Sequence, residues 1–93
     1  MPSVHRIGDP NDAGGIIIDP LTVSVFANGL LVAIVGAPVS AHVPCPSVPI
    51  HCAAIVVTGS PDVITENGNT VRTEDLDSCG HVRALGSPDV IAN

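Results

Sequence analysis

The sequence predicts a compact all-β domain with approximate three-fold internal symmetry. Three observations lead to this fold class: a repeated hexapeptide, Asn-Gly dipeptides between apolar runs, and a composition rich in Val, Ile, Gly and Pro. The 93 residues suit one domain, residues 1–93. Nine Gly and nine Pro favour short strands joined by tight turns over long helices.

The hexapeptide repeat is the first of these observations. Gly-Ser-Pro-Asp-Val-Ile occupies 59–64 and recurs at 86–91, and a looser version, Asp-Pro-Leu-Thr-Val, occupies 19–23. A second phrase alternates with it, as Arg-Ile-Gly-Asp at 6–9 and Arg-Thr-Glu-Asp at 72–75. Two alternating phrases indicate one structural unit that is used several times.

These phrases divide the chain into three units, and the second unit is lengthened by an insertion at 38–54. A recurring unit usually cannot bury its apolar face alone, and an open row of units would need protected edges. We therefore predict a single closed body. Its repeat units lie at about 6–29, 34–68 and 72–93.

Asn-Gly dipeptides predict two hairpins, at Asn28-Gly29 and Asn67-Gly68. Both residues of such a pair adopt positive φ readily, as a two-residue hairpin turn requires. The flanking runs are rich in β-branched and apolar residues, which favours strands. The predicted strands are 23–26 and 30–33 for the first hairpin and 63–66 and 70–72 for the second.

The predicted core is small and needs reinforcement. The hydrophobic share is 45%, but Phe26 is the only aromatic residue, and aromatic side chains normally supply much of a core's area. A domain of this length buries only about 60–65% of the surface that its unfolded chain exposes. We therefore expect a metal, disulfides or a partner to stabilise the fold.

The three cysteines favour a metal. The N-terminal residues lack an apolar run behind their charge, so we expect a chain made in the cytoplasm without a signal peptide. The longest apolar stretch, 29–39, is too short to span a bilayer. A cytoplasmic origin disfavours disulfides, whereas Cys residues accompanied by His residues indicate a metal site.

Charge and motifs exclude several classes of function. A net charge of −6 with only three Lys or Arg residues disfavours binding to nucleic acid. The sequence contains no His-Glu-x-x-His, Gly-x-Ser-x-Gly or phosphate-loop motif, and its only glutamates are Glu66 and Glu74. We therefore predict that the protein is not an enzyme and has no small-molecule substrate.

Taken together, these motifs resemble the PAAR-repeat family, over residues 4–93. The literal Pro-Ala-Ala-Arg stretch is absent, and only Arg72 remains at its Arg position. Family members often carry a His before Gly-Gly in the first unit, where this chain has Ala13. The most specific parts of the resemblance are 59–63, Asn67-Gly68, 79–81 and 86–90.

The resemblance implies a small cone of β-hairpins with a metal at its vertex. Its base would sit on a trimeric β-helical spike, one copy per trimer, in a contractile phage tail or a type VI secretion machine. The expected function is to sharpen this membrane-piercing spike and aid penetration of the target envelope, through transient contact. Such a protein is made in the bacterial cytoplasm and assembled at the tip of the phage tail (virion) or secretion spike.

The expected metal ligands are His42, His51, Cys79 and His81. Three His and one Cys match the family's habit, and a structural zinc takes four such ligands. Cys79 and His81 are two residues apart, so they would face the same side of a strand. Zinc is expected, with iron as the alternative.

A rival ligand set replaces His81 with Cys45, and Cys52 and His5 are held in reserve. Two other functions remain open beside the spike tip. A small metal-binding adaptor or adhesin would bind another protein without the one-per-trimer stoichiometry. A zinc hydrolase is less favoured, because a catalytic zinc needs an open coordination position and a nearby base.

Overall fold

The computed structural model describes residues 2–43 and 45–92. Strand β1 (Phe26–Ala27) pairs with β2 (Leu30–Leu31), and β3 (Ile64–Thr65) pairs with β4 (Gly68–Asn69), each pair antiparallel. The described part of the chain contains one short 3-10 helix, η1 (Pro49–His51), and no helix long and apolar enough to cross a membrane. The all-β prediction is confirmed.

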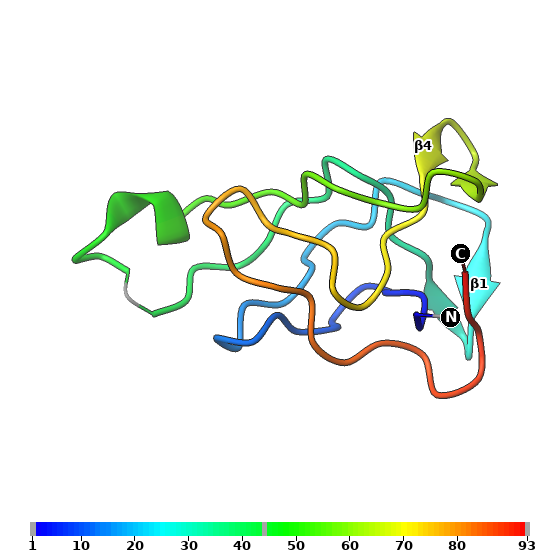
Figure 1. Cartoon of the computed structure of the whole chain (residues 1–93), viewed down its shortest axis with the longest axis horizontal. Helices are drawn as coiled ribbons and strands as arrows, with labels where there is room; N and C mark the ends of the chain where they lie inside the picture. The colour runs from blue at the N-terminus through cyan, green and yellow to red at the C-terminus, as the bar shows by residue number, and fades with distance from the viewer. Residues whose placement is uncertain (1, 44, 93) are drawn as a thin grey trace.

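The domain is elongated, with extents of 35 × 24 × 23 Å. Figure 1 shows the two hairpins at one end of the long axis and η1 at the other. The insertion within the second unit therefore projects at the end opposite the hairpins.

The first hairpin forms where the sequence predicts it. Phe26 pairs with Leu31 and Ala27 with Leu30. The turn between them is Asn28-Gly29, with φ of 54° and 81°. Both central residues have positive φ, as a two-residue hairpin turn requires.

The second hairpin differs from the prediction by one residue. Thr65 pairs with Gly68, so Glu66 and Asn67 form the turn, and Glu66 takes the positive φ, 56°. Gly68 lies in β4 and not in the turn. A side chain is excluded there because a Cβ would lie 2.6 Å from Cδ1 of Ile34. The glycine therefore serves a close approach between two segments that are far apart in sequence, and not the turn itself.

Outside these hairpins, single antiparallel bridges join the units in a cycle. The first unit pairs with the second, the second with the third, and the third returns to the N-terminal segment. The bridges are Arg6 with Val32, Ile34 with Thr70, and Arg72 with Val4. These three bridges therefore close the units into a ring.

A ring of three hydrogen bonds lies at the centre of this cycle. Ala33 N donates to His5 O (2.9 Å), Val71 N to Ala33 O (3.0 Å), and His5 N to Val71 O (2.9 Å). All three residues are fully buried. The third hairpin position is filled by the bridge between Ser3 and Ile91, so the two ends of the described chain complete the symmetry.

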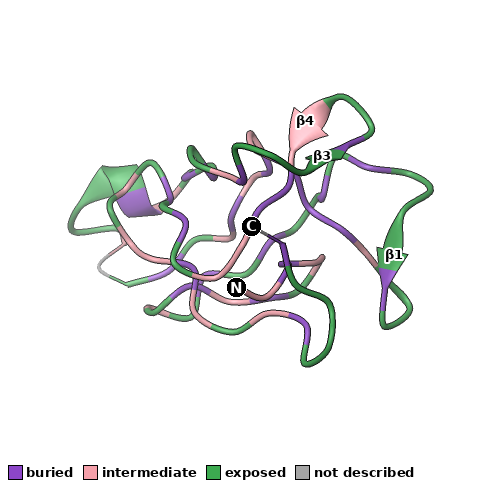
Figure 2. Ribbon diagram, turned by 45° about the vertical axis from the view of Figure 1, so that its right-hand side comes forward, coloured by how far each residue is buried: buried purple, intermediate pink, exposed green. Residues whose placement is uncertain are grey.

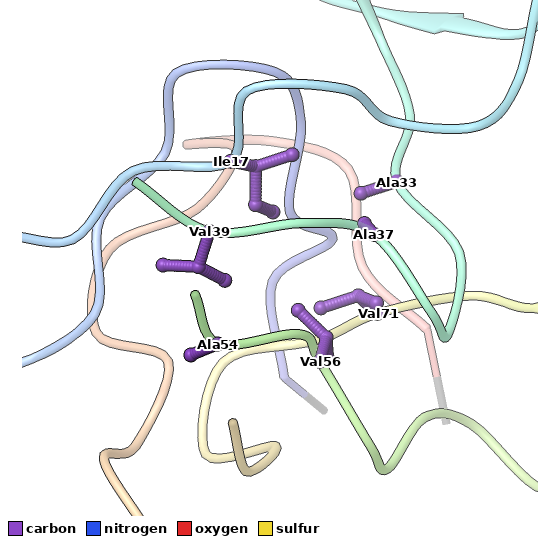
Figure 3. Close-up of a cluster of buried hydrophobic side chains, with 7 residues drawn as sticks. All are labelled: Ile17, Ala33, Ala37, Val39, Ala54, Val56 and Val71. Atoms are coloured by element: carbon purple, nitrogen blue, oxygen red, sulfur yellow. The ribbon is translucent and has the colours of Figure 1, made fainter. Parts of the chain in front are cut away.

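Small aliphatic side chains fill the core between the units (Figure 3). A second cluster lies closer to the hairpins and consists of Val4, Ala27, Val32 and Ala92. Phe26, the only aromatic residue, is exposed. The main cluster consists of Ile17, Ala33, Ala37, Val39, Ala54, Val56 and Val71.

The third unit places charge where the other two place aliphatic side chains. Three fully buried residues occupy equivalent positions in the three units: Ile17, Val56 and Arg83. They are equivalent because each exchanges backbone hydrogen bonds with the same part of its own unit. Arg83 Nη2 lies 2.9 Å from Asp77 Oδ2, and Asn11 Nδ2 donates to the same oxygen at 2.8 Å. A buried ion pair is thus built into one third of the core.

The buried imidazole of the ring predicts a loss of stability in acid. Burial, and then the charge of Arg83, lower the pKa of His5 from 6.5 to about 4. The unfolded chain therefore binds a proton at a pH where the folded chain does not. The free energy of unfolding should fall as pH falls from about 6.5 to 4, by about 3 kcal/mol from this group.

His5→Val provides the matched control, because the equivalent ring position already carries Val71. Denaturant unfolding of wild type and variant at several pH values isolates the contribution of His5, since all other titrating groups are shared. The difference in unfolding free energy should change in favour of the variant between pH 6.5 and 4. A constant difference would contradict this prediction.

Candidate metal centre

The structure brings the four expected ligands together. His42, His51, Cys79 and His81 each offer one ligand atom, and these atoms all lie within 4.8 Å of one another. His51 Nδ1 is 3.3 Å from His42 Nε2, and Cys79 Sγ is 3.4 Å from the same nitrogen. Both histidines of the insertion are buried, and the other two residues are partly exposed.

These distances fit a tetrahedral ion. With metal–nitrogen bonds of about 2.0 Å and metal–sulfur bonds of about 2.3 Å, ligand atoms at tetrahedral angles are about 3.3–3.6 Å apart. The separations of 3.3 Å and 3.4 Å are of this size, and the other ligand atoms lie within 4.8 Å, so small side-chain movements would complete the shell. The His/Cys cluster can therefore hold a metal ion such as zinc.

The insertion positions two of the histidines. His51 is the last residue of η1 and is the buried part of an otherwise exposed segment (Figure 2). His42 N donates to His51 O at 3.2 Å, and Cys45 N donates to His42 O at 2.8 Å. These backbone bonds hold the two imidazoles side by side.

A disulfide closes the same loop, contrary to the prediction from the sequence. Cys45 and Cys52 are bonded, with Cα atoms 5.3 Å apart. The backbone turns at His42 and η1 bring the two cysteines within bonding range, which no local sequence signal indicates. Cys45 is thus already bonded to Cys52. The cluster in this structure contains His81, and not Cys45 as in the rival ligand set.

The other two ligands come from a turn and not from a strand. Gly80, between Cys79 and His81, has φ of 91°, and its N donates to Asp77 O at 2.9 Å. The strand geometry predicted for the pair is therefore wrong, although both side chains still reach the cluster. His5, held in reserve as a ligand, lies in the central ring, and its Nε2 contacts Thr73 Oγ1.

The electrostatic surroundings favour neutral imidazole at His51. Burial, together with His81 and His42, lowers the pKa of His51. A neutral imidazole has a free lone pair, which metal binding requires.

Gly15 of the first unit leaves room for His42. A Cβ at this position would lie 2.5 Å from His42 Nδ1 and 2.9 Å from Asn11 Nδ2. The equivalent positions in the other units carry Ala54 and His81, as shown by the same backbone hydrogen bond. Glycine is therefore required at position 15 by the space that the side chain of His42 occupies, and not by the backbone conformation.

Gly15→Ala should therefore weaken metal binding. Overpacking of a fitted site costs about 1–3 kcal/mol, so we expect the affinity for zinc to fall about tenfold or more. Competition with a chromogenic chelator measures this. Gly14→Asn is the control, because a Cβ there meets nothing within 4 Å and Asn tolerates positive φ. Equal affinities of Gly15→Ala and wild type would contradict the steric argument.

Comparison with known families agrees with the geometry. A family model described as "PAAR motif" matches residues 7–83. No curated protein matches the chain significantly. The matched segment covers nearly all of the first unit, the whole second unit and the first half of the third, and it includes all four residues of the cluster. The chain therefore belongs to the PAAR-repeat family.

Proposed function

We propose that this protein is the structural tip of a trimeric β-helical spike, in a contractile phage tail or a type VI secretion machine. The hairpin end docks on the blunt end of the spike, one copy per trimer. The opposite end carries a zinc ion, or iron, held by His42, His51, Cys79 and His81. The tip has no catalytic step: it sharpens the spike and touches the target envelope transiently.

One observation carries this proposal: the hairpin end presents apolar side chains at three equivalent places. Phe26, Ile64 and Ile91 occupy equivalent paired positions, opposite Leu31, Asn69 and Ser3. They are 61%, 57% and 53% exposed. Figure 2 shows exposed residues in β1 and around the β3–β4 turn.

A second set of equivalent positions lies one residue earlier in each unit. Val25, Val63 and Val90 each accept one backbone hydrogen bond from the neighbouring segment, and they are 38%, 36% and 38% exposed. We call these two sets together the base. An apolar face with near-equal exposure at three related places complements the end of a trimer, where three identical chains meet.

Localisation follows from the same proposal. The chain is made in the bacterial cytoplasm and is then carried on the spike to the virion tip or the secretion apparatus. Its acidic charge, −6, gives it no electrostatic attraction to nucleic acid.

Binding to a purified spike tests this function. The probe is the trimeric β-helical spike protein encoded in the same genome, and the measurements are isothermal titration calorimetry and sedimentation. We expect one chain per three spike chains. Phe26→Asp should weaken binding at least tenfold, because it buries an unpaired charge in the interface.

Ile50→Asp is the matched control, since Ile50 is an equally apolar, 49% exposed residue of η1 at the opposite end. It should bind as the wild type does. Equal stoichiometry of tip and spike chains, or full binding by Phe26→Asp, would favour an adaptor or adhesin instead.

A further inference from the structure

We propose that Asp12 is a positioning residue for the metal centre, so that the first unit contributes to a site whose ligands come from the other two. Its carboxylate holds His81 in the one tautomer and orientation that present Nε2 to the ion. This inference rests on the metal binding proposed above.

The contact is direct. Asp12 Oδ1 lies 2.8 Å from His81 Nδ1, across 69 residues of sequence. His81 Nε2 is buried and has no hydrogen-bond partner among the described residues. A carboxylate only accepts hydrogen bonds, so Nδ1 must donate and a neutral ring then keeps its lone pair on Nε2. The unpaired nitrogen is therefore the one available to a metal.

His42 uses the same device with a different partner. Its Nδ1 lies 2.7 Å from the carbonyl oxygen of Ser40, which also only accepts. His42 Nε2 is thereby left to face Cys79 Sγ at 3.4 Å. Such outer partners fix the ring and raise the basicity of ligating imidazoles.

The first unit carries Asp12 at a position where the other two units carry a serine. The equivalent residues are Ser40 and Ser78. The backbone N of each serine donates to the residue of the adjoining segment that corresponds to Val82, whose O accepts from Asp12 N. Each serine Oγ accepts from a backbone N, that of Ile16 or Ile55, at 3.0 Å. Only in the first unit is the serine replaced, and only there does the side chain reach a histidine of the cluster.

Backbone hydrogen bonds hold the main chain of Asp12 next to its target. Asp12 N donates to Val82 O at 2.9 Å, one residue beyond His81. Asn11 forms a bridge with Arg83. The donor and the acceptor of the contact therefore belong to two paired segments, and the position of Asp12 does not depend on a flexible loop.

Asp12→Ser tests the proposal, because it restores the residue that the other two units use and so preserves the backbone contact. We expect the affinity for zinc to fall by about 10- to 100-fold. Asp12→Asn, whose amide oxygen still accepts a hydrogen bond, should lose less. Affinity is measured by competition with a chromogenic chelator.

Asp19→Ser is the matched control. It removes the same charge, and Asp19 Oδ1 accepts a hydrogen bond from Leu21 N, at 3.0 Å, far from the cluster in sequence. We expect it to bind zinc as the wild type does. Equal melting temperatures of the metal-free Asp12→Ser and Asp19→Ser proteins would show that the fold is unaffected.

Nuclear magnetic resonance of the zinc-loaded protein gives a readout that a merely structural role would not change. The Nδ1 proton of His81 should be visible and exchange slowly in the wild type, and exchange rapidly in Asp12→Ser. Wild-type affinity and an unchanged proton in Asp12→Ser would overturn the role of Asp12 alone. A wild type that binds neither zinc nor iron would overturn the metal centre itself.

Discussion

Removal of the metal should lower the melting temperature of the protein by tens of degrees. The four candidate ligands come from an insertion and a turn that are far apart in sequence, His42 and His51 on one side and Cys79 and His81 on the other. The main core cluster contains only Ile, Ala and Val side chains, and Cys79 packs against it. A core built from such small side chains leaves a larger share of the stability to the ion.

The size of the effect follows from mass action. A structural zinc in a small domain binds with about 10 kcal/mol or more, and an ion present at a thousand times its dissociation constant adds about 4 kcal/mol to the free energy of unfolding. For a domain of this size, each kcal/mol shifts the melting temperature by about 4–8 °C. We therefore expect a decrease of about 15–30 °C on chelation.

Calorimetry with and without a strong chelator, followed by elemental analysis, measures this effect. Cys79→Ser should already melt at the lower temperature and respond little to chelation. The double variant Cys45→Ala with Cys52→Ala should retain its metal, because neither cysteine belongs to the cluster. A chelator that removes no metal and leaves the melting temperature unchanged would refute the metal centre.

Breaking the buried ion pair should cost about 3–5 kcal/mol, which is the second large effect. Arg83 and Asp77 are both buried, and Arg83 also donates to the carbonyls of Asp9 and Gly15. Burial lowers the pKa of the Arg83 guanidinium, while Asp77 raises it. Arg83→Val would leave the Asp77 carboxylate buried without its positive partner.

The second unit suggests how to remove the pair without this cost. Val56 stands where the third unit has Arg83, and Val39 stands where it has Asp77. The double variant Arg83→Val with Asp77→Val should therefore recover much of the stability lost by either single variant, although Asn11 loses an acceptor. Denaturant unfolding of the four proteins completes the cycle, and additive losses would contradict it.

The repeat and its turns were predictable because their signals are local. Asn28-Gly29 forms the predicted turn, and the alternating phrases mark segments that occupy equivalent places. The one-residue shift at Glu66-Asn67 was not predictable in this way, since Gly68 is required by Ile34 of another strand segment. A contact between distant segments outweighed the local preference.

The candidate site was likewise predictable from the sequence only in part. The four ligands are identified by residue type and by resemblance, and the structure gathers them. The disulfide between Cys45 and Cys52 depends on the distance between two turns, and a Cys count alone does not reveal it. An alignment of the three units would have singled out Arg83 and Asp12. Arg83 stands where the other units have aliphatic side chains, and Asp12 stands where they have serine.

The ring of hydrogen bonds among His5, Ala33 and Val71 also determines when the protein can fold during synthesis. No two of these residues close the ring, so the segment around His5 must wait on the ribosome until the third unit has emerged. The bridge of Ser3 with Ile91 extends this requirement to the end of the third unit. Long-range closure of this kind slows folding, so nascent chains of this protein remain open, and accessible to chaperones and proteases, until the third unit has been translated.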